Sequence, residues 1–138
     1  MTEVDDEPLG YLLQRVATSL RAEVTSAALE PVGVSFPQYI CMRVLSHSPG
    51  RSNADLAREV NVSPQAMNMV VRGLQERGLV NRPATVASGR SLPAELTREG
   101  IALLKRTDAG IRDAERKVLA PLRPEQRTHL KKLLAALG

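Results

Sequence analysis

The sequence is poor in cysteine and in aromatic residues. Its 138 residues include one cysteine, Cys41, so an intramolecular disulfide and a zinc site built on cysteine pairs are both excluded. The aromatic residues are Tyr11, Phe36 and Tyr39, and tryptophan is absent. Proteins that bind single-stranded nucleic acid stack its bases on several aromatic side chains, so the sequence gives that function little support. With so few aromatic residues the core must be aliphatic, which favours packed helices.

Long hydrophobic runs are also missing. The longest apolar run has only a few residues, far short of the roughly 20 that cross a bilayer. The N-terminal stretch MTEVDDEPLG is acidic, whereas a secretory signal begins with basic residues and continues with an apolar segment. With 43% hydrophobic and 25% charged residues, the composition is that of a soluble protein of one domain, with or without an oligomerisation appendage. We therefore expect a cytoplasmic protein that does not bind membranes.

The residue patterns that carry catalysis are missing as well. The two histidines, His47 and His129, are far apart, and the sequence contains neither the HExxH nor the GxSxG pattern. It also has no glycine-rich loop that could cradle a phosphate. We therefore predict that the protein is not an enzyme and that it has no catalytic residue, no metal site and no cofactor.

Charge is unevenly distributed along the chain. The net charge is +4, but residues 1–34 contain two basic and six acidic residues, a balance of −4. Residues 35–98 contain eight basic and four acidic residues, and residues 99–138 contain nine and five, a balance of +4 in each case. A basic middle region is typical of a surface that binds a polyanion. A solvated basic surface without a partner has the same composition, so charge alone leaves both interpretations open.

Two short helices are predicted in the basic middle region, with a tight connection between them. Ser52 and Ser63 can each cap the start of a helix, and Gly78 closes the second one. Only Asn61 and Val62 connect the two helices. This arrangement is the helix-turn-helix pattern.

The second of these helices has two contrasting faces. At 100° per residue its apolar residues share one side, which consists of Met67, Val70, Val71 and Leu74. The opposite side carries Gln65, Asn68, Met69 and Arg72. Glutamine and asparagine can hold adenine through two hydrogen bonds, whereas a helix N-terminus and an arginine can bind phosphate. The outer face is therefore a candidate for reading double-stranded DNA.

This face gives each residue an expected role. The residues expected at base edges are Gln65, Asn68 and Met69. Ser63 and Arg72 are expected at phosphates. Ser52 and Pro64, which stand at the starts of the two helices, complete the predicted DNA-binding set on this motif. The alternative is a solvated surface that carries two amides and binds nothing.

A short hairpin is predicted after the second helix. Residues 79–82 and 92–96 have the pattern of two strands around a turn at Ser88 and Gly89, and Pro83 and Pro93 limit both strands to edge-type pairing. Arg90 stands at the tip, where a thin hairpin can place it in the negative potential of a narrow minor groove. The alternative is a loop arginine without a partner. Helix, turn, helix and hairpin together predict a winged helix-turn-helix, a mainly helical fold with a small β-hairpin wing.

Amphipathic helices flank this unit on both sides. An apolar stripe over residues 9–27 predicts one helix, and two more helical patterns follow in residues 99–138. The winged unit, residues 35–98, is too small to cover these apolar faces. We therefore expect residues 1–34 and 99–138 to form a homodimer, because obligate dimers bury such faces against their own copy. An intramolecular three-helix bundle is the alternative.

Several segments together form a recognisable pattern. They are FPQYICMRVL at 36–45, ADLA at 54–57, VSPQAM at 62–67, LQERGLV at 74–80 and LTREG at 96–100. The pair Leu-x3-Gly-Leu-Val and Leu-Thr-x2-Gly, at this separation, is a fairly specific signal. On these motifs the chain resembles the MarR family of transcriptional regulators over nearly its whole length.

The resemblance implies a function and an assembly. It implies an obligate homodimer, held by the first helix and the last two, that binds a pseudo-palindromic operator and usually acts as a repressor released by a small molecule. One departure concerns the wing, because family wings commonly carry an acidic residue just before the tip arginine. Residues 87–91 read Ala-Ser-Gly-Arg-Ser, without an acid, so the resemblance supports Arg90 less strongly than it supports the recognition helix.

The resemblance also implies a ligand pocket between the dimerisation helices and the winged unit, often for phenolic or aromatic carboxylate compounds. Arg15, Tyr39 and His47 are the candidate ligand-binding residues. A surface salt bridge for Arg15 and a helix-end position for His47 are equally good interpretations. Peroxide-sensing relatives place a reactive cysteine near the start of the first helix, whereas Cys41 lies in the second. We therefore expect Cys41 to be a buried core thiol and not a redox sensor.

The sequence thus predicts a sequence-specific, double-stranded DNA-binding regulator, most simply a homodimeric repressor relieved by a small aromatic or phenolic ligand. The alternative is a winged-helix module that binds another protein without specific DNA binding. The two differ in salt dependence, because binding to phosphates weakens steeply as salt rises and binding through an apolar patch does not.

Overall fold

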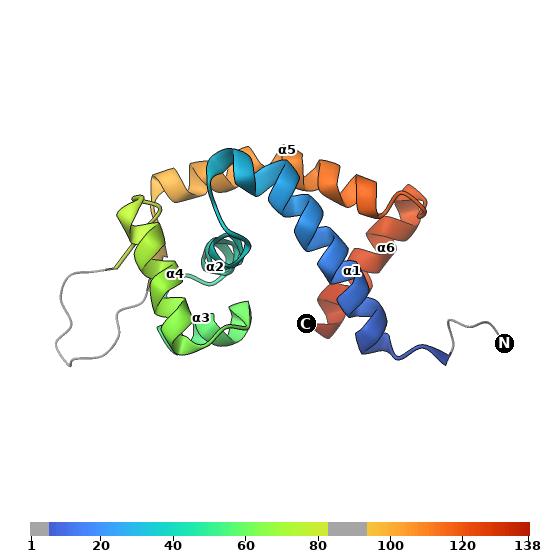
Figure 1. Cartoon of the computed structure of the whole chain (residues 1–138), viewed down its shortest axis with the longest axis horizontal. Helices are drawn as coiled ribbons and strands as arrows, with labels where there is room; N and C mark the ends of the chain where they lie inside the picture. The colour runs from blue at the N-terminus through green and yellow to red at the C-terminus, as the bar shows by residue number, and fades with distance from the viewer. Residues whose placement is uncertain (1–5, 83–93) are drawn as a thin grey trace. The chain divides into compact units, whose positions relative to one another are not determined.

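The structure is a computed structural model that describes residues 6–82 and 94–138. The chain divides into two compact units (Figure 1). The central unit is Leu29–Asp108, and the terminal unit combines Met1–Ala28 with Ala109–Gly138. The predicted class, mainly helical with a small two-stranded sheet, is confirmed.

Six α-helices carry the fold of the described residues. They are α1 (Leu9–Val24), α2 (Phe36–His47), α3 (Asn53–Val60), α4 (Pro64–Glu76), α5 (Arg98–Val118) and α6 (Pro124–Leu137). A π-helical turn, η2 (Thr25–Leu29), and a 3-10 turn, η3 (Glu30–Val32), follow α1. Strands β1 (Val80–Asn81) and β2 (Glu95–Leu96) pair antiparallel, with Val80 opposite Leu96.

Serine side chains set the starts of three helices in the central unit. Ser35 accepts a hydrogen bond from the Gln38 N–H at 3.2 Å, and the Gln38 side chain accepts one from the Ser35 N–H at 3.0 Å. Ser52 and Ser63 each accept a hydrogen bond, at 3.1 Å, from the backbone N–H three residues further on. These bonds satisfy N–H groups that have no partner inside the helix, and α3 and α4 begin where the sequence predicted.

The core of the central unit is aliphatic, as expected from the scarcity of aromatic residues. Helices α2, α3 and α4 pack against one another, and the base of the hairpin packs against α2 and α4. The largest fully buried hydrophobic side chains of the unit are Leu29, Met42, Leu56, Met67, Leu74 and Leu103. Helix α4 therefore stands on a closed core that fixes its position.

The segments 74–80 and 96–100, which are separate in the sequence, meet at the start of α5. The Thr97 hydroxyl accepts a hydrogen bond from the Gly100 N–H at 3.1 Å and donates one to the Gly78 carbonyl at 2.6 Å. The Thr97 N–H also donates to the Leu79 carbonyl. A Cβ at Gly100 would lie 2.2 Å from that same carbonyl oxygen, a distance that no side chain tolerates. This contact explains why threonine and glycine stand at these two positions.

Two predicted elements are shorter than expected. The regular part of the first helix ends at Val24, three residues before the end of the predicted stripe, and gives way to η2 and η3. Pro31 has no N–H to continue an α-helix, and Gly33 adopts a left-handed conformation at φ 69°. The first strand covers two residues where four were predicted. Of the second strand, predicted at 92–96, residues 92 and 93 lie outside the described residues, and β2 covers Glu95–Leu96.

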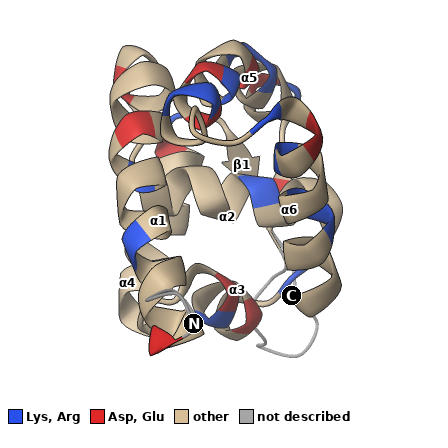
Figure 2. Cartoon of the chain, turned by 90° about the vertical axis from the view of Figure 1, so that its right-hand side faces the viewer, with Lys and Arg blue, Asp and Glu red and all other residues tan. Residues whose placement is uncertain are grey.

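The terminal unit contains α1, the second part of α5, and α6. Gly110 of α5 lies so close to the first helical segment that a Cβ would stand 2.7 Å from the Ala27 carbonyl oxygen. Lys117 pairs with Glu23 at 3.3 Å. Basic and acidic residues are interspersed along α5 (Figure 2). No helix among the described residues has the length and apolar character needed to traverse a bilayer.

Candidate nucleic-acid interface

A tight turn joins α3 to α4. Asn61 ends α3 in the left-handed conformation, with φ 62° and ψ 50°, which asparagine tolerates better than most residues. Its N–H donates to the Arg58 carbonyl at 3.3 Å, and the Val62 N–H donates to the Ala57 carbonyl at 3.0 Å. The turn thus uses the carbonyls at the end of α3, and Ser63 then opens α4 directly.

Helix α4 has the two faces that its sequence predicts. Met67, Val71 and Leu74 are buried, with at most 1% of each side chain exposed. The predicted base-facing residues Gln65, Asn68 and Met69 are all exposed, and Met69 is 72% exposed. Arg72 is exposed as well. Among the described residues, none forms a hydrogen bond or ion pair with the side chains of Gln65, Asn68 or Arg72, so their polar groups face solvent.

The helix starts supply further donors. Ser63 and Pro64 are exposed, and Ser52 is half-buried. The oxygens of both serines accept the capping bonds described above, which leaves each hydroxyl hydrogen able to donate to a phosphate. Pro64 has no N–H and the N–H groups of Ala66 and Met67 bond to Ser63, so the N–H of Gln65 and the positive end of the helix dipole are what the N-terminus of α4 offers an anion.

Two other polar residues hold this surface in place, and the sequence pattern did not single them out. Arg77, just after α4, donates to the Gly33 carbonyl at 2.8 Å and to the Val32 carbonyl at 2.9 Å. Asn53, the first residue of α3, is buried and forms hydrogen bonds to Pro64 at the start of α4 and to Arg82 just after β1. Their partners lie 11 to 45 residues away in sequence, so no local spacing could have revealed them.

The predicted wing is described only at its base. Strand β1 follows α4 along the chain, and β2 precedes α5 and pairs with β1. Next to β2, the Ala94 carbonyl accepts a hydrogen bond from the Gly50 N–H at 3.4 Å. Arg90, the predicted tip residue, lies in the segment 83–93, outside the described residues.

The candidate ligand residues fall in different units. Arg15 is exposed on α1 in the terminal unit, with its guanidinium 5.7 Å from the centre of the Tyr11 ring. Tyr39 and His47 belong to α2 in the central unit, where His47 is exposed at the helix end. The Arg43 guanidinium lies over the Tyr39 ring, with its carbon 5.4 Å from the ring centre. The Tyr39 hydroxyl accepts a hydrogen bond from Arg43 Nε at 3.3 Å.

Arg43, which the sequence analysis did not single out, contacts the candidate residue Tyr39. Its guanidinium also lies 3.6 Å from the Asp108 carboxylate of α5. An arginine above an aromatic ring combines a positive charge with an apolar surface, which are the two features of an aromatic carboxylate site.

The single cysteine is a core residue, as predicted. Cys41 is fully buried in the central unit, and burial raises the pKa of its thiol from the ordinary value of 9.0 to about 11, against a smaller opposing effect of the nearby Arg82 charge. A thiol with so high a pKa is almost wholly protonated at neutral pH and is a poor nucleophile. The described residues contain no cluster of histidine, cysteine or acidic side chains suited to a metal ion.

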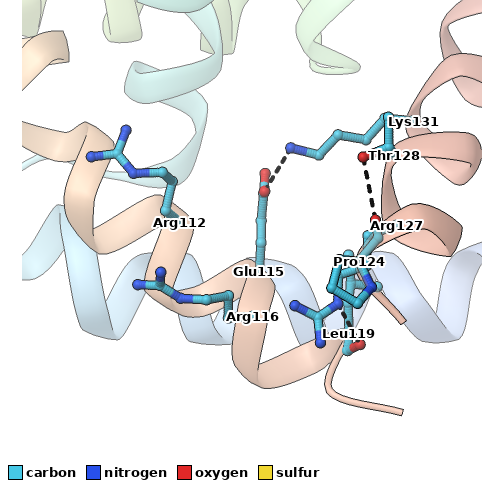
Figure 3. Close-up of a pocket in the computed structure, with 8 residues that line it drawn as sticks. All are labelled: Arg112, Glu115, Arg116, Leu119, Pro124, Arg127, Thr128 and Lys131. Atoms are coloured by element: carbon cyan, nitrogen blue, oxygen red, sulfur yellow. Dashed lines mark hydrogen bonds and ion pairs between the residues drawn. The ribbon is translucent and has the colours of Figure 1, made fainter. Parts of the chain in front are cut away.

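A basic hollow of about 270 Å³ lies between α5 and α6 (Figure 3). Glu115 pairs with Lys131 across it at 2.7 Å. Arg127 Nε donates to the Leu119 carbonyl at 3.2 Å and to the Leu122 carbonyl at 3.0 Å. These bonds join the end of α5 to α6, so the hollow's polar groups stabilise the turn between the two helices.

Comparison with known proteins places this arrangement in context. Residues 32–91 match a family model described as "MarR family". The HTH-type transcriptional repressor Rv2887 of Mycobacterium tuberculosis is 55% identical over 97% of this chain and 96% of its own length.

Two solved structures extend the comparison. The M. tuberculosis MarR family protein Rv2887 in complex with salicylic acid superposes with a TM-score of 0.81, at 53% identity over 98% of this chain and 99% of that one. The same protein in complex with DNA gives a TM-score of 0.78, at 48% identity over 96% of this chain and 98% of that one. The similarity covers both the central and the terminal unit.

Proposed function

The chain belongs to the MarR family of transcriptional regulators, and we propose that it is a homodimeric repressor that binds a pseudo-palindromic DNA operator through α4. The observation that carries this proposal is the exposed, amide-bearing face of α4, whose opposite face is anchored in a closed core. A rigid helix with free hydrogen-bonding groups can enter a major groove without first reorganising. The protein acts in the cytoplasm, together with the DNA it regulates, and has no enzymatic activity.

Base reading is assigned to the outer face of α4. Gln65 and Asn68 each offer a donor and an acceptor, which match the N6 and N7 groups of adenine. Met69, with its exposed thioether, offers an apolar contact for a thymine methyl group. Each well-formed bidentate contact contributes about 1–3 kcal/mol of discrimination against the wrong base.

Phosphate binding is assigned to the start of α4 and to charged residues around it. Ser63 and Pro64 stand at the helix N-terminus, and Arg72 lies two turns further along the exposed face. Ser52 adds a hydroxyl at the start of α3. Arg90 is assigned to the minor groove on its position in the sequence.

Dimerisation is assigned to the terminal unit. Within residues 6–28 and 109–138, seven large hydrophobic side chains are exposed, which are Leu9, Tyr11, Leu13, Val16, Leu133, Leu134 and Leu137. A second copy of the chain would bury them and would present a second α4 to the DNA. Two-fold dimers of helix-turn-helix proteins bind half-sites about 34 Å apart, one turn of the duplex.

The effector is proposed to be a small aromatic carboxylate. A close relative binds salicylic acid, and this chain places the Arg43 guanidinium over the Tyr39 ring. Arg15, Tyr39 and His47 remain the candidate contacts, with Arg43 as an additional partner for the carboxylate. Salicylate should release a preformed complex with operator DNA, whereas cyclohexanecarboxylate, which has the charge without the aromatic ring, should release it far less.

Fluorescence anisotropy tests the DNA-binding function. The wild-type chain is titrated with DNA from upstream of its own gene and with a random duplex, at two salt concentrations. We expect tighter binding to the upstream DNA and a steep loss of affinity for both duplexes as salt rises. Equal affinity for the two duplexes would contradict an operator there, and no binding by a folded dimer would favour a protein partner instead.

The Asn68→Ala variant tests the recognition face. We expect a loss of about 1–3 kcal/mol on the operator and little change on random DNA, because a base contact acts only at the cognate site. Gln14→Ala is the matched control, since Gln14 is also an exposed amide on a helix but belongs to the terminal unit. Equal losses on both duplexes for Asn68→Ala would refute the base-reading role.

A further inference from the structure

A buried polar side chain lies between the recognition helix and the base of the wing. Asn53, the first residue of α3, is only 8% exposed. Burying an amide without hydrogen bonds costs several kcal/mol in an apolar environment, so a buried asparagine needs partners for both of its ends. Asn53 has both, and each partner belongs to a different DNA-binding element.

The first partner is the start of α4. Asn53 Nδ2 donates to the Pro64 carbonyl at 3.2 Å, and Pro64 is the first residue of that helix. This bond crosses the turn and fixes the N-terminus of α4 to the N-terminus of α3. Ser63 and Gln65, which are assigned to phosphate and base, are the residues on either side of the bonded carbonyl.

The second partner is the base of the wing. Arg82 donates from a terminal guanidinium nitrogen to Asn53 Oδ1 at 3.4 Å. Arg82 directly follows β1 and directly precedes segment 83–93, which contains Arg90 in its sequence. Its Nε is buried and has no hydrogen-bond partner among the described residues, so the bond to Asn53 Oδ1 is the hydrogen bond that holds this guanidinium within the described part of the chain.

We propose that Asn53 is a positioning residue that couples the start of α4 to the base of the wing through its bonds to Pro64 and Arg82. We do not assign Asn53 to a base contact. It holds the start of α4 and the base of the wing in a fixed position relative to each other. Two binding elements whose relative position is fixed lose less conformational freedom on binding than elements that move independently. The inference rests on the proposed DNA-binding function.

A double-mutant cycle tests the coupling. Operator affinity is measured by anisotropy for wild type, Asn53→Ala, Arg82→Ala and the double variant. We expect each single change to weaken operator binding by about tenfold and the double change to weaken it by little more, because the same link is lost in all three variants. Losses that multiply to about a hundredfold in the double variant would overturn the proposal.

A direct phosphate contact by Arg82 is the main competing explanation, and salt dependence separates the two. A positioning role predicts that Arg82→Ala leaves the slope of log affinity against log salt concentration unchanged. Loss of a phosphate contact reduces that slope by about one unit. A reduced slope would assign Arg82 to the DNA backbone and overturn the proposal.

Two further variants guard against simple unfolding. Asn53→Asp keeps an acceptor for Arg82 but removes the donor to Pro64, so we expect an operator affinity between those of wild type and Asn53→Ala, with the fold checked by circular dichroism. Arg82→Lys keeps a donor and should restore part of the affinity lost in Arg82→Ala. If neither variant differs from its alanine counterpart, the bonds do not act as proposed.

Failure of the proposed function and failure of this inference have different signatures. If the wild type does not discriminate operator from random DNA, the proposed function itself is overturned. If the wild type discriminates but the losses from Asn53→Ala and Arg82→Ala multiply in the double variant, only this inference is overturned.

Discussion

The central and terminal units use the same kinds of side chain to opposite effect. Among the described residues, fifteen of the buried hydrophobic ones lie within Leu29–Asp108, whereas three, Val24, Ala28 and Ala114, lie in the terminal unit. The exposed large hydrophobic residues in the described part of the chain are distributed the other way, with seven in the terminal unit and two, Met69 and Ile101, in the central unit. The central unit has a finished core, whereas the terminal unit keeps an apolar surface that a single chain leaves in water. The difference is consistent with the proposal that the central unit binds DNA and the terminal unit binds a second chain.

The largest expected effect comes from placing charge on the apolar surface of the terminal unit. Replacing both Leu134 and Leu137 of α6 by glutamate should yield a monomer in light scattering, because two charges cannot be buried against a partner copy. Operator affinity should then fall by at least about a hundredfold, since two linked α4 helices bind together with far higher avidity than one. Lys132→Glu is the control, because it changes the net charge by the same two units at an exposed site on α6. A dimer that persists in the double variant would contradict the assignment of this surface.

A second prediction contrasts one leucine from each unit. Leu74→Ala in α4 should lower the free energy of unfolding by about 2–5 kcal/mol, because the side chain is fully buried and its removal leaves a cavity. Leu133→Ala, at a side chain that is 52% exposed, should change it by much less at protein concentrations where the chain is monomeric. Urea unfolding at low and high protein concentration measures both. A Leu133→Ala effect that grows with concentration would report the dimer interface, and one as large as that of Leu74→Ala in the monomer would refute the contrast.

The core of the central unit should also show a pH dependence from Cys41. The folded chain keeps the thiol protonated up to a pKa of about 11, whereas the unfolded chain loses the proton near 9.0. The folded form therefore binds more protons between these values, so stability falls as pH rises from 9 to 11, by about 2–3 kcal/mol in total. Unfolding of wild type and Cys41→Ala at pH 8, 9.5 and 11 isolates this contribution. Parallel curves for the two proteins would show that the thiol does not carry it.

The smallest expected effect is a gain in stability from Gly10→Ala, and Gly100 provides the contrasting case. At Gly10, near the start of α1, no described residue outside the adjoining part of the helix comes within 4 Å of the missing Cβ, so Gly10→Ala should raise stability by about 0.5–1 kcal/mol. Gly100, near the start of α5, lies against the Leu79 carbonyl, so Gly100→Ala should be strongly destabilising. Thermal unfolding of the two variants measures the contrast. Destabilisation by Gly10→Ala would mean that a neighbouring chain approaches α1 closely at that point.

Local chemistry explains how much of the fold was predictable. Ser35, Ser52 and Ser63 bond to groups three residues away, so the starts of α2, α3 and α4 could be located from the sequence. The exposed face of α4 followed from helical periodicity for the same reason. The end of α1 was less predictable, because its apolar stripe continues through η2 although the hydrogen-bonding pattern changes.

Long-range bonds explain what the sequence could not reveal. Arg77 and its Gly33 partner are 44 residues apart, and Asn53 and Arg82 are 29 apart. No periodicity links such positions, and each residue taken alone resembles an ordinary polar residue at a helix end. The same holds for Arg43, which packs on Tyr39 one turn away but pairs with Asp108, more than sixty positions further along the chain. Residues that position the predicted contacts therefore emerged only from the three-dimensional arrangement.

The burial of Cys41 has a practical consequence for measuring conformational changes of this protein. Because the chain has no other cysteine and this thiol is sealed in the core, a cysteine introduced at Met69 would be the only one that a maleimide probe reaches under native conditions. The natural sequence is thus already a clean background for attaching one spin label to each recognition helix. The distance between two such labels in a homodimer, recorded with and without salicylate, would give the spacing of the helices in the two states directly.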